Sequence, residues 1–198
     1  MVIHKPAGIL TVPGKTEDLQ DCMINRLVKL EPKTLLIHRL DRDTSGILVF
    51  GLSRWGQKSI SRQFQERQTD KTYQAIVAGH LDGQGTVDVP VIYDPSRPPL
   101  HIAEPSHNKP AVTEWKAIEH FEIKGQPVTR VALTPITGRS HQLRVHMQFL
   151  GHPIVGDTLY AAPDQQDLMP RLCLHAERLS FHHPQTDERI EFICPVPF

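Results

Sequence analysis

The order of apolar segments along the chain constrains its fold more than any other feature. Helical spacing of apolar residues occurs over 17–30, over 54–67 and in a short stretch between Ser140 and Gly151. Runs that favour strands occur at 47–50, 72–78, 111–118, 128–134, 172–181 and 189–194. Strands therefore outnumber helices and do not alternate strictly with them. This order predicts an α+β fold with a mixed, mostly antiparallel central sheet and a few flanking helices and loops.

The chain length of 198 residues fits one domain. Residues 82–110 are rich in Gly and Pro, but their length and their interspersed apolar residues favour a loop-rich excursion within one domain over a linker. The chain starts abruptly at Val2 in what resembles the end of a strand, so we expect the first strand to be truncated. We predict a single domain over residues 1–198.

The composition gives no sign of a specialised environment. Lys plus Arg equals Asp plus Glu at 22 each, so the net charge does not indicate nucleic acid. The three cysteines are widely spaced and form no Cys-x-x-Cys pair, which favours reduced thiols in a cytoplasmic protein. No apolar run approaches the roughly 20 residues that span a bilayer, and no long apolar stripe marks a subunit interface. We predict a cytoplasmic monomer with no membrane partner.

Asp41 is the first candidate for chemistry. It stands two residues after Arg39, at the point where a strand-like segment gives way to a turn. Alternate residues of an extended segment project to one face, so the two side chains would form an anion-handling pair in a cleft. The same residues can simply bend the chain, because Asp favours turns and Thr44-Ser45-Gly46 would continue one. The residues alone leave both interpretations open.

A second candidate is the basic stretch around Thr137–His146. No Asp or Glu occurs over 123–156, whereas Lys124, Arg130, Arg139 and Arg144 all lie there. A Gly-containing turn that enters a helix, with cations and no acid nearby, suits a phosphate; a solvated basic face is the alternative. The span 39–71 is also basic, with seven Lys or Arg against four acids. A chain without net charge can therefore still present a positive cleft to RNA.

The histidines give little support for a metal site. His141 and His146 are five residues apart, so they do not share a helix face as an i, i+4 pair would, and no carboxylate accompanies them. We predict no metal.

The segment His38–Gly46 resembles the active-site motif of the RluA family of pseudouridine synthases, which isomerise uridine to pseudouridine within RNA. His4–Gly8, Lys71–Tyr73 and Thr137–His146 resemble three further motifs of that family, in the same order. The likeness covers nearly the whole chain and is nearest to the RluA branch, which modifies ribosomal and transfer RNA. It implies the family's mixed sheet, and we expect no S4-type module of the kind that precedes some relatives.

The resemblance also implies three catalytic residues. Asp41 falls on the family's catalytic aspartate, which acts on the ribose either by attacking C1′ or by removing the C2′ proton to give a glycal. Arg144 falls on the arginine that pairs with this aspartate and keeps it ionised. Tyr73 falls on the active-site tyrosine, which lies against the uracil ring and helps to remove the C5 proton.

Three further residues are expected to bind the substrate. By resemblance, Arg39 fills the space left by the extruded base and contacts phosphate. Leu143 is expected to form part of the apolar wall around the base, and Arg139 lies in the turn suited to phosphate. Because nothing is added in the reaction overall, we expect an isomerase that acts on RNA without cofactor or metal. The alternatives are a non-catalytic RNA-binding protein of the same fold and a metal-dependent hydrolase.

Overall fold

The apolar run at 47–50 forms the centre of the most deeply buried strand, β3 (Ser45–Gly51), in a computed structural model that describes residues 1–198. All seven residues of β3 are buried, as expected for a strand that is covered on both faces. The chain divides into two compact units. Unit 1 comprises residues 1–71 and 175–197, and unit 2 comprises residues 72–174 and Phe198.

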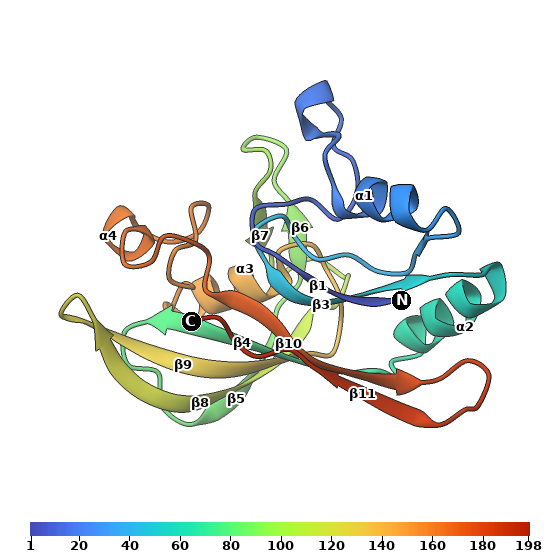
Figure 1. Ribbon diagram of the computed structural model, residues 1–198. Helices are drawn as coiled ribbons and strands as arrows, with labels where there is room; N and C mark the ends of the chain where they lie inside the picture. Colours follow the sequence, from blue (N-terminus) through green and yellow to red (C-terminus); the bar gives the residue numbers. More distant parts are fainter. The chain divides into compact units, whose positions relative to one another are not determined.

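Unit 1 is built around β3. Its other elements are β1 (Val2–Lys5), the 3-10 turn η1 (Glu17–Leu19), α1 (Met23–Leu30), β2 (Leu35–Leu36), α2 (Arg54–Gln65), β10 (Leu174–His182, whose first residue belongs to unit 2) and β11 (Arg189–Ile193). Strands β1 and β2 pair with β3 in antiparallel fashion, β10 pairs with it in parallel, and β11 is antiparallel to β10 (Figure 1). Helix α2 starts where the Ser53 hydroxyl accepts a hydrogen bond from Gly56 N, and its Ile60 enters the core of unit 1.

Gly46 is required where β3 meets β10. Its φ is +118°, and a Cβ atom there would lie 2.3 Å from the carbonyl oxygen of Ala176. Only glycine allows both this backbone conformation and this close approach.

Unit 2 is an antiparallel sheet with a helix beside it. Its elements are β4 (Asp70–Ala78, whose first two residues belong to unit 1), β5 (Gln84–Asp88), β6 (Val91–Tyr93), β7 (His101–Ala103), β8 (Val112–Ile123), β9 (Gln126–Pro135), α3 (Gln142–Phe149) and α4 (Pro163–Gln166). The strand order is β4-β9-β8-β5, and β6 and β7 form a separate hairpin. Met147 of α3 is fully buried and packs in one core with Ile76 of β4 and Leu133 of β9.

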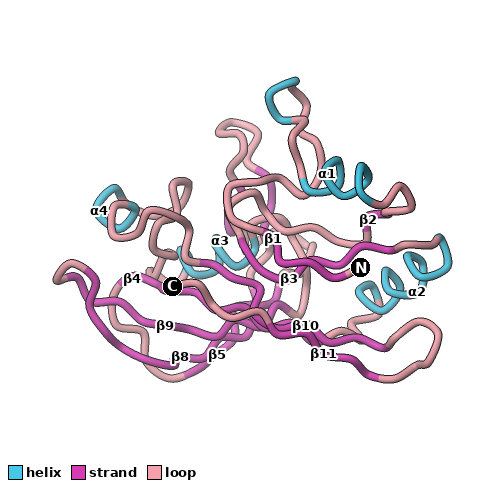
Figure 2. Tube along the Cα trace, in the orientation of Figure 1, coloured by secondary structure: helices cyan, strands magenta, loops and turns pink.

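The predicted α+β class, with a mixed and mostly antiparallel arrangement of strands and few helices, is confirmed (Figure 2). The helix expected over 17–30 is interrupted between η1 and α1. There Cys22 forms a β-bridge with Leu10, and Met23 N donates to the Leu10 carbonyl. Ser140 does not cap α3: the N-cap is His141, in the left-handed conformation with φ +55°. None of the helices is long and apolar enough to cross a membrane. That residues 1–198 form a single domain stays a prediction.

Candidate active site

The backbone on the N-terminal side of Asp41 is fixed by Thr11. The Thr11 hydroxyl donates to the Leu40 carbonyl at 2.8 Å and accepts from the Leu40 N–H at 3.1 Å. Thr11 is 2% exposed and Leu40 is 6% exposed, so water does not compete for these bonds. One side chain therefore satisfies both backbone groups of the residue that precedes Asp41.

The backbone on the C-terminal side of Asp41 is fixed by Lys5. The Lys5 ammonium is fully buried and donates to the carbonyl oxygens of Pro6, Ile9 and Arg42, each at 2.8 Å. Gly8 N donates to the same Arg42 carbonyl at 3.0 Å. A buried ammonium is stable only when its donors are satisfied, and this one is satisfied by the loop that it holds. The first motif, His4–Gly8, thus acts as a support for the second.

Asp41 itself is half-buried and Arg39 is exposed. After them, Thr44 and Ser45 are buried at the start of β3, and the Ser45 hydroxyl lies 2.8 Å from His175 Nδ1 on β10. The motif His38–Gly46 is therefore more than a solvated turn: its backbone is held at Leu40 and Arg42 and is buried from Thr44 onward, and Asp41 lies between these held residues.

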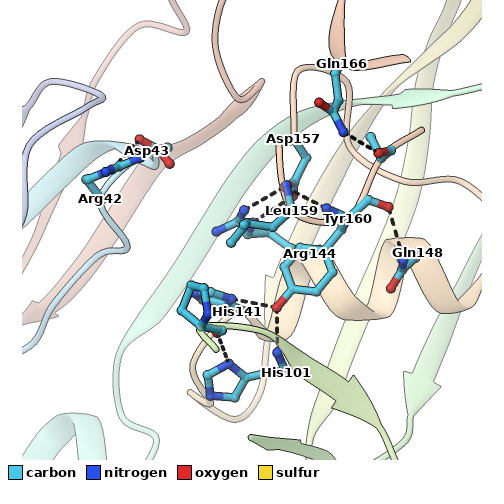
Figure 3. Close-up of polar contacts among 12 residues, drawn as sticks. Arg42, Asp43, His101, His141, Arg144, Gln148, Asp157, Leu159, Tyr160 and Gln166 are labelled. Atoms are coloured by element: carbon cyan, nitrogen blue, oxygen red, sulfur yellow. Dashed lines mark hydrogen bonds and ion pairs between the residues drawn. The ribbon is translucent and has the colours of Figure 1, made fainter. Parts of the chain in front are cut away.

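In unit 2, Arg144 on α3 forms a buried, bidentate ion pair with Asp157 (Figure 3). Its Nε donates to Oδ2 at 2.7 Å and its Nη2 donates to Oδ1 at 2.6 Å. The Asp157 carboxylate is fully buried and also accepts from the N–H groups of Leu159 and Tyr160. This geometry fixes the plane of the guanidinium. Sequence reasoning gave Asp157 no role.

Tyr160 links Arg144 to the turn before α3. Its ring lies under the guanidinium, with Arg144 Cζ 4.9 Å from the ring centroid. Its hydroxyl accepts from His101 N at 2.9 Å and lies 2.6 Å from His141 Nδ1 (Figure 3). Tyr160 is therefore a positioning residue for the motif Thr137–His146, and it too was missed from the sequence.

Two polar side chains of α3 hold the motif Thr137–His146 against β8. The Gln142 carbonyl oxygen accepts from Thr137 Oγ1 and Arg139 N, while its amide donates to the Val112 carbonyl and to Thr113 Oγ1. His146 is fully buried, and burial lowers its pKa, so the ring is neutral. These bonds explain why a short helix carries so many buried polar residues.

The remaining predicted residues lie as follows. Tyr73 is half-buried at the start of β4, Leu143 is 7% exposed in the core of unit 2, and the Arg139 Nε donates to the Pro110 carbonyl at 3.1 Å. Asp41 and Arg39 belong to unit 1, whereas Tyr73, Arg139, Leu143 and Arg144 belong to unit 2. The structure brings Arg144 together with Asp157, and its pairing with Asp41 stays a prediction.

One cluster has metal-ligating side chains. His4, His175 and Cys194 offer ligand atoms that all lie within 4.8 Å of one another. However, both ring nitrogens of His175 already have partners, the Ser45 hydroxyl at 2.8 Å and the Cys194 carbonyl at 3.2 Å. A metal would have to displace one of these contacts, so the donor set fits an ion poorly. The expectation of no metal stays a prediction.

Comparisons with known proteins agree with these motifs. Residues 1–149 match the family model described as RNA pseudouridylate synthase. The Dual-specificity RNA pseudouridine synthase RluA of Pasteurella multocida (strain Pm70) is 45% identical over 199 residues, which cover 100% of this chain and 90% of that protein. The protein of the same name from Escherichia coli (strain K12) is 44% identical over 200 residues, with the same coverage.

Solved structures also resemble the fold. Human RNA Pseudouridylate Synthase Domain Containing 1 matches with a TM-score of 0.83 and 33% identity, over 100% of this chain and 80% of that one. Human RNA Pseudouridylate Synthase Domain Containing 4 matches with a TM-score of 0.76 and 25% identity, over 99% and 85%. The chain thus belongs to the RNA pseudouridylate synthase family.

Proposed function

We propose that this chain isomerises uridine to pseudouridine in ribosomal RNA, transfer RNA or both, as a cytoplasmic monomer. The main support for the proposal is the fixed backbone around Asp41. Thr11 and Lys5 bind the backbone on either side of Asp41, which is itself half-buried. A carboxylate fixed in this way is suited to act on a substrate atom. The relatives named dual-specificity synthases support the choice of RNA.

The reaction breaks the N1–C1′ bond, turns the uracil and rejoins it through C5. Asp41 acts on the ribose, at C1′ as a nucleophile or at C2′ as a base. By the family resemblance, we propose that Arg144 supplies the opposing charge, through a guanidinium that Asp157 and Tyr160 keep in one orientation. Tyr73 lies against the ring and assists removal of the C5 proton. In this proposal, side chains of the chain itself supply every group that takes part in these steps.

Binding of the substrate requires extrusion of the target nucleotide, which costs a few kcal/mol. Arg39 is exposed and its planar guanidinium can occupy the space left in the stack. Leu143 lines the base pocket and Arg139 receives a phosphate. If Arg39 acts in this way, Arg39→Ala will reduce turnover of folded RNA more than turnover of an unstructured oligonucleotide. Equal losses on both substrates would exclude the extrusion role.

Release of tritium from RNA labelled at uracil C5 tests the function directly. We expect release by the wild-type chain, and none by Asp41→Asn, which should still fold and bind RNA. Asp43→Asn is the matched control, because Asp43 stands two residues away and only forms an ion pair with exposed Arg42. Binding without release by the wild type would instead indicate a non-catalytic RNA-binding protein.

The RNA substrate is identified by a second experiment. RNA from a strain that lacks the gene is treated with carbodiimide, which marks pseudouridine, and is sequenced beside RNA from the parent strain. A missing mark in ribosomal RNA, in transfer RNA or in both identifies the substrate. No missing mark in either would contradict the proposal.

A further inference from the structure

Helix α2 and the hairpin β10–β11 border an open groove in unit 1, here called the α2 groove. Its volume is about 850 Å³, and its lining includes Trp55, Lys58 and Arg62 of α2 together with His182 and Arg189 of the hairpin. In Figure 1 α2 lies beside the hairpin that ends in β11. No residue assigned above to catalysis or to uridine binding lines this groove.

The walls of the α2 groove are fixed to each other. The Gln63 amide donates to the His182 carbonyl at 2.9 Å, and its oxygen accepts from His182 N at 2.8 Å. Arg189 is held by Asp70 and by the Ser180 hydroxyl. A ligand would therefore meet a preformed surface and would cost little ordering of the protein.

The exposed face of α2, of which Lys58 and Arg62 line the groove, is positively charged, although Glu66 and Asp187 also line the groove. Arg54, Lys58 and Arg62 recur every fourth residue, about 6 Å apart along the axis, and all three are exposed. Helix α2 contains no Asp or Glu. Arg62 pairs with Glu66 just beyond the helix, but neither Arg54 nor Lys58 forms an ion pair. The excess of cations over 39–71 in the sequence thus gathers on the outer side of this helix.

Trp55 adds an aromatic surface to these cations. Its side chain is 56% exposed although it lines the groove, so most of its apolar area stays in water in the free protein. Nucleobases stack on such rings whatever their identity, and cations beside the ring hold the phosphates. Exposed cations beside an exposed indole are the features of a surface for single-stranded nucleic acid.

We propose that the α2 groove binds a single-stranded segment of the substrate RNA outside the target uridine, with phosphates on Lys58 and Arg62 and one base on Trp55. This inference rests on the proposed function, because it takes the ligand to be the RNA that is modified. A protein partner fits less well, because it would remove these cations from water and would need acidic side chains to compensate for that cost. The groove therefore contributes affinity for RNA and leaves the chemistry to Asp41.

The experiment measures the affinity of substrate RNA as a function of salt concentration. Lys58→Gln should weaken binding and lower the slope of log K against log salt by about 0.7, the value for one phosphate contact on a single strand. Lys33→Gln is the matched control, because Lys33 is exposed in the same unit and does not line the groove. It should leave the slope unchanged. Equal slopes for Lys58→Gln and the wild type would overturn the proposal.

Trp55 is tested separately. Trp55→Ala should reduce RNA affinity by roughly 5- to 100-fold, with a larger effect on KM than on kcat, and Trp55→Phe should recover most of this loss. Unchanged affinity in Trp55→Ala would also overturn the proposal. Tritium release is measured on every variant. If the groove variants release tritium and bind RNA with unaltered affinity, the proposed RNA binding in the α2 groove is refuted, whereas the synthase activity is not. Absence of release by the wild type refutes the synthase, whatever the groove variants show.

Discussion

The buried ion pair between Arg144 and Asp157 offers a quantitative test of what holds α3 in place. Removing one partner of such a pair leaves an uncompensated buried charge, which costs about 3–5 kcal/mol. Asp157→Asn keeps the volume and one acceptor for the backbone N–H groups of Leu159 and Tyr160, so the lost charge dominates. We therefore expect the free energy of unfolding to fall by about 3 kcal/mol.

The assay is equilibrium unfolding in urea, with thermal unfolding beside it. For a chain of this length, 3 kcal/mol corresponds to a fall in Tm of about 6–12 °C. Asp21→Asn is the control: it removes the exposed pair between Asp21 and Arg26, whose side chains are 64% and 56% exposed, and should leave the midpoint almost unchanged. Because Asp157 orients Arg144, turnover by Asp157→Asn should fall even at temperatures where the variant is fully folded.

A double-mutant cycle separates the pair from its surroundings. If Arg144→Met and Asp157→Asn act through one interaction, the double variant will be less destabilised than the sum of the two single variants. A loss below about 1 kcal/mol in Asp157→Asn, or strict additivity in the cycle, would refute the reasoning.

Three further predictions concern unit 1. Thr11→Val leaves both backbone groups of Leu40 unsatisfied and should cost about 2 kcal/mol of stability and lower kcat more than RNA affinity, with Thr11→Ser restoring both; unchanged kcat would contradict the hold on Asp41. Gly46→Ala should destabilise the chain by about 2 kcal/mol or more in the same urea assay, and a smaller loss would show that β10 can shift. Burial lowers the pKa of His38 to about 3, so stability should fall as pH drops from about 6.5 towards 3. His38→Gln should flatten this dependence, and an unaltered slope would show that other groups cause it.

The sequence predicts most strands because they combine β-forming residues with burial. The apolar run at 47–50 and the strand at 72–78 lie within β3 and β4. The helix at 54–67 is found at Arg54–Gln65, with Ser53 as its cap, because local signals of spacing and capping agree there. The prediction of one continuous helix over 17–30 was wrong, because the break at Cys22 depends on a bridge to Leu10, which lies outside the segment. The strands within 82–110 were missed because turn residues dominate that composition.

The candidate site shows the same division. Local pattern and family resemblance together pointed to Asp41 and Arg144 as residues of interest. The residues that support them were not predictable, because their side chains act on backbone or on charges far along the chain: Thr11 on Leu40, and Asp157 on Arg144. A buried lysine or aspartate in the sequence carries no mark that distinguishes it from an exposed one. The proximity of His4, His175 and Cys194 was likewise not predictable, because these residues lie far apart in the sequence.

The discontinuity of unit 1 has a consequence for biosynthesis. Residues 72–174 are contiguous, so unit 2 can form while the C-terminal hairpin is still inside the ribosome, whereas β3 lacks its parallel partner β10 until residue 175 and its successors emerge. We therefore expect the usual order, in which the N-terminal part matures first, to be reversed. A nascent chain that stalls before this point carries its aspartate on an unfinished support, and we expect such chains to be recognised by chaperones or degraded before they can modify RNA.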